Sequence, residues 1–176
     1  MFPMYYAQIR KYDVANWPWI RVSLFVSGCR HACPWCFNAI AWNFKFGKPY
    51  TSQEEDYILS LLKDEQNNWL TLLGWEPLEP ENAPYIASLV KRVKETFPNK
   101  NIWCYSGFTY EELLARENNE LSIKEVLENI DVLVDWKFVL EKKNLKLAFR
   151  GSENQRLINI PKSLKSNQVV LLENYN

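Results

Sequence analysis

Apolar runs typical of buried strands alternate along this chain with amphipathic helical patterns, and this alternation limits the fold more than any other feature. The strand-like runs lie at residues 20–26, 70–73, 102–105, 132–134, 145–149 and 169–172. Helical patterns separate most of them. Such alternation favours parallel strands joined by right-handed helical crossovers, in a sheet that is either open or partly closed into a barrel. We therefore expect an α/β fold.

Ser/Thr-x-x-Glu patterns, which are typical of helix N-termini, occur at residues 52–55, 109–112 and 122–125. The first predicts a helix to about residue 63. Another helix is expected over residues 84–97, where apolar side chains recur at three- and four-residue steps before a proline. Because loops that follow parallel strands meet at one edge of a sheet, the loops after the first four runs are expected to share one mouth.

The length of 176 residues indicates one domain over residues 1–176, because two domains would each have a thin core. The chain has 21 basic residues (Lys and Arg) and 21 acidic residues (Asp and Glu), so its formal net charge is zero. It therefore lacks the broad positive field expected of a protein that binds nucleic acid or an anionic membrane. No run approaches the roughly 18 apolar residues of a membrane span. We expect a cytoplasmic protein without nucleic-acid or membrane partners. The tail after Pro161 is weakly patterned and is left unassigned.

Three of the four cysteines, Cys29, Cys33 and Cys36, lie in a C-x3-C-x2-C loop after the first strand-like run. This clustering indicates metal or redox chemistry rather than a disulfide framework. Three thiolates can leave one iron of a [4Fe-4S] cluster with an open coordination site, where chemistry can occur. The alternative is a closed zinc site with His31 or Cys104 as fourth ligand. Cys104 lies in an apolar strand-like run, so we expect a buried, inert thiol.

The cysteine loop, followed by a Gly-x-Glu-Pro turn after the second run, resembles the radical S-adenosylmethionine (SAM) enzymes. Within them the chain is similar to the activating proteins of anaerobic, class III ribonucleotide reductases, roughly over residues 5–156. The resemblance is carried by six blocks in the same order: Asp13–Arg21, Leu24–Cys29, Leu72–Pro80, Ile102–Trp103, Asp131–Phe138 and Arg150–Gln155. Such dispersed blocks are more specific than a cysteine triplet alone.

The resemblance implies an incomplete (βα) barrel of the radical SAM type, with Cys29, Cys33 and Cys36 holding a [4Fe-4S] cluster and SAM on its fourth iron. It implies that SAM is cleaved reductively and that the resulting radical generates a glycyl radical on the large catalytic subunit of anaerobic ribonucleotide reductase. A low-potential electron donor, flavodoxin-like or ferredoxin-like, is a second implied partner. The assembly is left open between a homodimer and a heterotetramer with the large subunit.

The same resemblance implies a set of residues that contact the cofactor. They are Trp35, Cys36 and Phe37 around the last cysteine, Gly74, Trp75 and Glu76 in the turn, and Asp135 and Lys137 after the fourth run. For the last two, a strand-end ion pair is an equally good interpretation. Arg150, Asn154 and Gln155 are interpreted as a structural loop network in preference to a cofactor or partner contact.

Two other functions stay open on the residues alone. The first is an activase of another glycyl radical enzyme, or a radical SAM enzyme acting on a small molecule. The second belongs to a different class, a non-catalytic zinc-binding interaction module. Iron content and SAM cleavage distinguish zinc binding from the radical SAM functions, and a glycyl radical that appears only with the reductase identifies the activase.

Tryptophan and glycine are unusual in number and linked in position. The chain has 8 tryptophans and only 5 glycines, below the roughly 7% glycine of ordinary proteins. Six tryptophans stand where the resembled family has glycine: Trp17, Trp19, Trp35, Trp69, Trp75 and Trp136. If these six residues were glycine, the chain would have 11 glycines and 2 tryptophans. We hypothesise that the source organism reads the UGA codon as glycine, and that the sequence was translated with UGA as tryptophan. The alternative is that the tryptophans are genuine and the site is remodelled.

Overall fold

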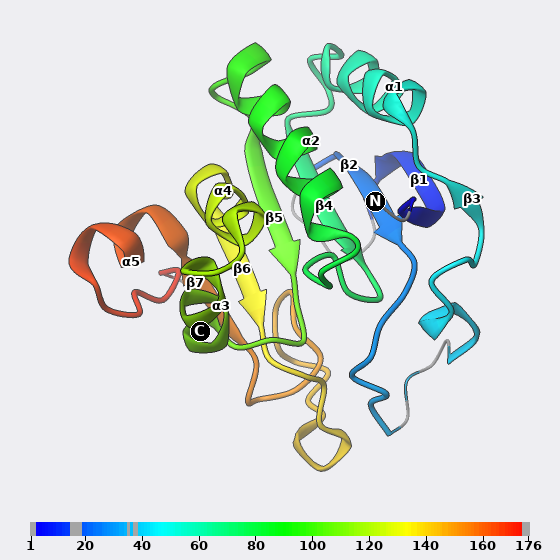
Figure 1. The fold of residues 1–176 in the computed structure, drawn as a ribbon. Helices are drawn as coiled ribbons and strands as arrows, with labels where there is room; N and C mark the ends of the chain where they lie inside the picture. Colours follow the sequence, from blue (N-terminus) through cyan, green and yellow to red (C-terminus); the bar gives the residue numbers. More distant parts are fainter. Residues whose placement is uncertain (1–2, 15–18, 35, 37–38, 174–176) are drawn as a thin grey trace.

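The computed structural model describes residues 3–14, 19–34, 36 and 39–173, which contain a seven-stranded mixed sheet (Figure 1). Its spatial order is β3-β1-β2-β4-β5-β6-β7. The strands are β1 (Tyr5–Asp13), β2 (Arg21–Val26), β3 (Lys48–Pro49), β4 (Trp69–Gly74), β5 (Asn101–Tyr105), β6 (Val132–Asp135) and β7 (Arg156–Asn159). The four central strands β2, β4, β5 and β6 are parallel, whereas β1, β3 and β7 pair antiparallel. The predicted α/β class is confirmed.

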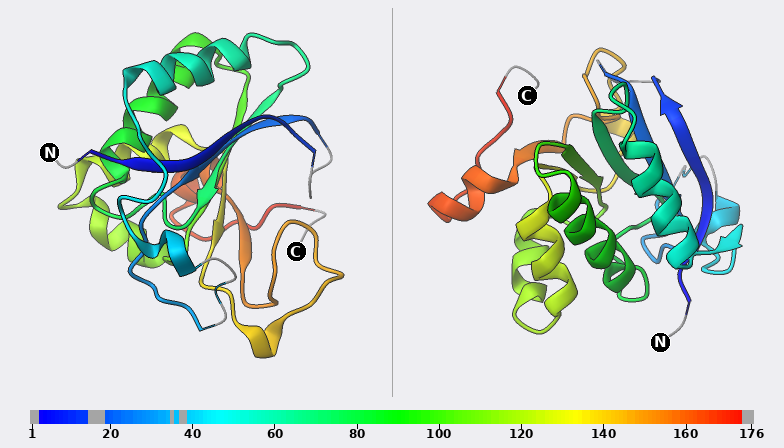
Figure 2. Two further views of the ribbon diagram at one scale, coloured as in Figure 1. Left: turned by 90° about the vertical axis from the view of Figure 1, so that its right-hand side faces the viewer. Right: turned by 90° about the horizontal axis from the view of Figure 1, so that it is seen from above.

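Five α-helices accompany the sheet in the described part of the chain. They are α1 (Ser52–Leu62), α2 (Ala83–Thr96), α3 (Tyr110–Glu117), α4 (Leu121–Asn129) and α5 (Ile160–Ser166). Two views show α1 to α4 along one face of the sheet (Figures 1 and 2). Two 3-10 turns, η1 (Ala39–Trp42) and η2 (Leu140–Lys142), lie in the loops. None of the described helices is both long and apolar enough to cross a membrane.

All three capping patterns lie at or next to a helix start, but only one of them identifies the capping residue itself. Thr109 caps α3 in a capping box with Glu112, as expected. The box of α1 uses Thr51, one residue before the predicted Ser52 pattern, because the Thr51 side chain faces the free amides of the first turn. The Ser122 pattern predicts the helix but not its cap: α4 begins at Leu121, so Ser122 lies in its first turn and does not cap it.

The core has two parts because the sheet buries both faces. Alternate strand residues such as Leu24, Leu72 and Leu133 pack with the apolar sides of the helices in the larger part. The smaller part, on the other face, contains Trp103, Val132, Val134 and Leu157, with Phe149 and Leu172 packed against it. Figure 2 shows the segment between β6 and β7 on the side away from the helices. That segment closes the face that helices leave uncovered.

The edges of the sheet differ from the sequence-based expectations. β1 was not expected; its residues are partly buried or exposed except for buried Asp13, and they lack the apolar continuity of a central strand. Residues 145–149 do not form a strand, and residues 169–172 contribute only an isolated bridge from Leu171 to Ile158. Pairing with β6 instead places a short antiparallel strand, β7, at residues 156–159. Whether these segments form strands depends on tertiary pairing, since an apolar run by itself does not provide a neighbouring strand.

Candidate functional site

The loops after β2, β4, β5 and β6 line one pocket of about 250 Å³, which we call the mouth pocket. This confirms the expectation of a shared mouth at the carboxyl ends of the parallel strands. The described residues that line it are Cys29, His31, Cys33, Cys36, Trp42, Gly74, Trp75, Tyr105, Ser106, Gly107, Trp136, Lys137, Phe138 and Gln155.

All three clustered cysteines are free thiols that line the mouth pocket and are neither fully buried nor fully exposed. Burial raises the pKa of the Cys29 thiol to about 12, and it also raises the pKa of Cys33. Binding of metal to these thiols must therefore release protons. Among the described residues, no three Cys, His, Asp or Glu side chains converge as ligands of a single metal ion. A [4Fe-4S] cluster places its thiolates on separate irons, so three thiols spread around one pocket suit its ligand chemistry.

Cys104, by contrast, is completely buried on β5 among core residues and does not line the mouth pocket. Burial raises the pKa of its thiol well above the ordinary value. The expectation of a buried thiol is confirmed.

The turn after β4 needs glycine at its first position. Gly74 has φ of +110°, and a Cβ added there would lie 2.7 Å from the carbonyl oxygen of Val26. Its backbone and Trp75 line the mouth pocket, and the Trp75 ring packs edge-on against Phe46 at 6.0 Å between centroids. The turn thus brings its backbone close to the three thiols.

Glu76 is fully buried and engaged with the protein on every side. One carboxylate oxygen accepts hydrogen bonds from the Leu78 amide and the Ser106 hydroxyl, each at 2.9 Å. The other lies 2.7 Å from the Gly107 amide nitrogen and 2.9 Å from His31 Nε2. Glu76 is not among the lining residues of the mouth pocket, so its side chain joins loops behind the pocket.

Asp135 and Lys137 separate at the end of β6. The Asp135 carboxylate is fully buried, accepts a hydrogen bond from the Tyr110 amide at 2.9 Å, and pairs with Arg156. A strand-end ion pair therefore exists, but its cation is Arg156 rather than Lys137. Lys137 itself lines the mouth pocket. Its position suits a contact with an anionic group there.

The Arg150–Gln155 segment is a loop network, as the preferred interpretation stated. Gln155 Oε1 accepts a hydrogen bond from the Gly151 amide at 2.9 Å, and its Nε2 donates to the carbonyl of Trp136 at 3.1 Å. Asn154 donates to the carbonyl of Lys137 at 2.8 Å. The segment therefore holds the backbone of the loop after β6 beside the mouth pocket.

The six questioned tryptophans occupy different environments. Trp17 and Trp35, like the candidate Phe37, lie outside the described residues. Trp136 adopts φ of +81°, a left-handed conformation that favours glycine, and is 43% exposed. Trp75 and Trp136 both line the mouth pocket, whose volume lies below the roughly 300–1,000 Å³ of typical ligand sites. A nucleotide would gain room if both indoles were absent.

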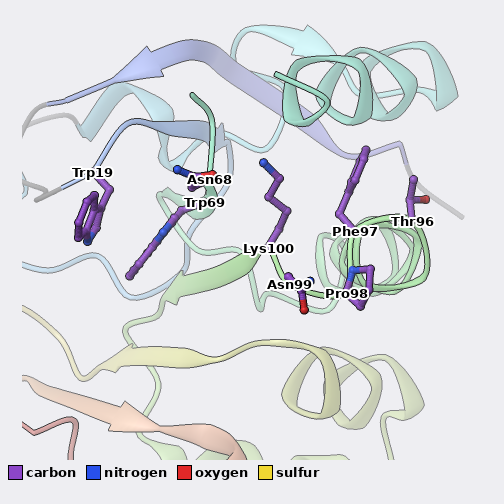
Figure 3. A pocket seen from close by; sticks show the side chains of 8 residues that line it. All are labelled: Trp19, Asn68, Trp69, Thr96, Phe97, Pro98, Asn99 and Lys100. Carbon is purple, nitrogen blue, oxygen red and sulfur yellow. The ribbon is translucent and has the colours of Figure 1, made fainter. Parts of the chain in front are cut away.

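The remaining two lie at the opposite end of the strands. Trp19 and Trp69 stack with ring centroids 6.5 Å apart and line a cavity of about 620 Å³ (Figure 3). The other lining residues come from the segments before β4 and β5: Asn68, Thr96, Phe97, Pro98, Asn99 and Lys100. This cavity contains none of the cysteines and is separate from the mouth.

Two residues that the sequence analysis did not single out, Arg30 and Glu79, brace the cysteine loop. The Arg30 amide donates to Glu79 Oε1 at 2.6 Å, and its guanidinium reaches Glu79 Oε2 at 2.8 Å and pairs with Glu81. Glu79 is only 2% exposed. The only local feature that marks Glu79 in the sequence is its place in a proline-containing turn, directly before Pro80. That feature does not indicate a contact with Arg30.

Three free thiols at the carboxyl ends of the four parallel strands suit a protein that binds an iron–sulfur cluster, and a family model supports this class. The model, described as a 4Fe-4S single cluster domain, matches residues 15–158. Several relatives carry the name anaerobic ribonucleoside-triphosphate reductase-activating protein. The one from Escherichia coli K12 is 40% identical over 154 residues, covering 86% of this chain and 96% of its own. The relative from Vibrio cholerae is 42% identical over 154 residues, which cover 86% of this chain and 96% of its own. The relative from phage T4 is 38% identical over 156 residues, which cover 88% of this chain and 93% of its own. The chain belongs to this family of activating proteins.

Proposed function

We propose that the protein is a radical SAM activase that generates a glycyl radical on the large subunit of anaerobic ribonucleotide reductase. The observation that carries this proposal is the placement of Cys29, Cys33 and Cys36 around one pocket, beside the Gly74 turn and Lys137. Family membership supports the reaction, because the relatives are named as activating proteins of that reductase.

In this proposal the three thiolates hold the [4Fe-4S] cluster and the fourth iron is left to SAM. When bound, the reduced cluster supplies the single electron that splits SAM. The backbone at Gly74 and Trp75 offers hydrogen-bonding groups to the methionine part of SAM, and Lys137 is suited to its carboxylate. Cys36, Trp35 and Phe37 stay predicted contacts by resemblance. For Glu76 and Asp135 we propose supporting roles, since both carboxylates are already bound within the protein.

The finer properties belong to the same proposal. The two-edged sheet with four loops at one mouth supports an incomplete barrel of the radical SAM type over a single domain. A cytoplasmic location agrees with thiols that must stay reduced. The low-potential donor and the assembly with the large subunit stay predictions.

Anaerobic reconstitution of the full chain tests the proposal. We expect about four irons and four sulfides per chain. SAM cleavage should follow reduction, and a glycyl radical signal should appear only with the reductase. A chain that binds zinc without iron and leaves SAM intact would instead be the interaction module. A radical on another enzyme, with none on the reductase, would point to a different activase.

A further inference from the structure

We propose that His31 is a positioning residue that ties the cysteine loop to Glu76 and thereby sets the hydrogen bonding of Cys29 and the reduction potential of the cluster. This inference rests on the proposed function, because it requires the cluster to bind at the three thiols. His31 stands two residues after Cys29 and two before Cys33. Its side chain is therefore a short, direct link between the loop and whatever it contacts.

The contact is a buried one. His31 Nε2 lies 2.9 Å from Glu76 Oε2, with the two side chains 8% and 0% exposed. Glu76 is itself fixed by the Gly107 amide and the Ser106 hydroxyl of the loop after β5. The imidazole thus joins three loops at one carboxylate: the cysteine loop, the turn after β4 and the loop after β5.

The imidazole is also enclosed by packing. Its ring lies edge-on to Phe108 with centroids 4.4 Å apart. The backbone of Gly107 is so close that an added Cβ would lie 2.4 Å from His31 Cδ2. Gly107 does not have a positive φ, so glycine is favoured there by the nearby ring rather than by backbone conformation. The ring position is therefore fixed by contacts on several sides.

The backbone amide of the same residue reaches the sulfur. His31 N lies 3.4 Å from Cys29 Sγ and donates a hydrogen bond to it. Hydrogen bonds to a cluster sulfur stabilise the more negative, reduced state and raise the reduction potential. Because the side chain is anchored at Glu76, the amide is held toward Cys29. Loss of the anchor should free the amide and also leave the Glu76 charge without its imidazole donor, and both effects lower the potential.

The first test compares His31→Phe with the unchanged chain. Phenylalanine keeps a ring against Phe108 but removes the nitrogen that faces Glu76. We expect the reconstituted full-length variant to bind iron and sulfide, and its midpoint potential, measured by redox titration followed by electron paramagnetic resonance, to shift downward. His31→Gln, which restores a side-chain donor, should recover part of the shift. An unchanged potential in His31→Phe would overturn the inference.

The second test moves the ring without removing its nitrogens. In Gly107→Ala the new methyl overlaps His31, so we expect a downward shift in the same direction. In a His31→Ala background the ring is absent, and Gly107→Ala should add no further shift, because the two changes act through one contact. Equal shifts by Gly107→Ala with and without His31 would contradict the proposed link.

The two proposals fail in different ways. If the unchanged chain takes up zinc and no cluster, the proposed function is lost. If it binds a redox-active cluster and both His31→Phe and Gly107→Ala keep its potential, only the positioning role is lost. If neither variant takes up iron, His31 determines the loop fold and the proposed tuning role is equally overturned.

Discussion

Arg156, the first residue of β7, pairs with the buried carboxylate of Asp135, the last residue of β6. Its Nε lies 3.1 Å from Asp135 Oδ1, and the two residues are partners in the antiparallel register. The same guanidinium reaches Glu111 on α3, and these contacts raise the Arg156 pKa. This ion pair fixes the end of β6, where the chain turns into the loop that carries Lys137.

Asp135→Asn should destabilise the fold more than it changes the chemistry. The substitution removes the charge opposite Arg156 at a buried position, and we expect the free energy of unfolding to fall by about 2–4 kcal/mol. Glu111→Gln is the matched control, because its exposed pair with Arg156 should contribute about 1 kcal/mol or less. Denaturant unfolding measures both. Equal effects of the two variants would contradict the structural role given to Asp135.

The cysteines should divide three to one. Cys29→Ala, Cys33→Ala and Cys36→Ala should each lose most of the iron bound after anaerobic reconstitution, because each removes one of the three proposed cluster ligands. Cys104→Ala should retain it, since that thiol is buried in the core away from the mouth pocket. Iron and sulfide analysis decides. Loss of iron in Cys104→Ala would show that the fourth cysteine takes part.

Trp136→Gly should stabilise the protein. A side chain at φ of +81° costs of order 1–2 kcal/mol, and the contact of the Arg156 guanidinium with the ring, 5.5 Å from its centroid, returns about 0.5–1 kcal/mol. We expect a net gain of about 1 kcal/mol in unfolding free energy. Trp103→Gly, a change in the buried core, should lose about 3–5 kcal/mol. A destabilised Trp136→Gly would favour a genuine tryptophan.

Mass spectrometry of the protein from its natural source tests the codon hypothesis directly. We expect glycine at positions 17, 19, 35, 69, 75 and 136, and tryptophan at Trp42 and Trp103. Tryptophan at all eight positions would refute the hypothesis. The two mouth positions, 75 and 136, also predict that the glycine form binds SAM more tightly, which equilibrium binding to both reconstituted forms can measure.

Gln155→Ala should loosen the loop after β6. Its amide joins Gly151 to the carbonyl of Trp136, and loss of these hydrogen bonds should cost about 1–3 kcal/mol of stability. Since the loop presents Lys137, we expect several-fold weaker SAM binding. Gln168→Ala, an exposed change near the C-terminus, is the control. If Gln155→Ala leaves both stability and SAM affinity unchanged, this segment does not brace the loop after β6.

Several parts of the site could be predicted because their signals are local. The C-x3-C-x2-C spacing singled out three thiols that line one pocket, and the position of each loop after a parallel strand predicted that the loops meet. The roles of Glu76 and Asp135 could not be predicted in the same way. Each carboxylate is bound by groups more than 20 residues away in sequence, such as Gly107 and Arg156.

The sequence by itself determined the α/β class, the parallel central strands and the grouping of three thiols in one loop, because hydrophobic periodicity and cysteine spacing act over a few residues. Only the tertiary structure decided which apolar runs pair as strands, which cation forms the ion pair with Asp135, and that His31 contacts Glu76. These outcomes depend on register and packing between distant segments. Their energies exist only once the sheet has assembled.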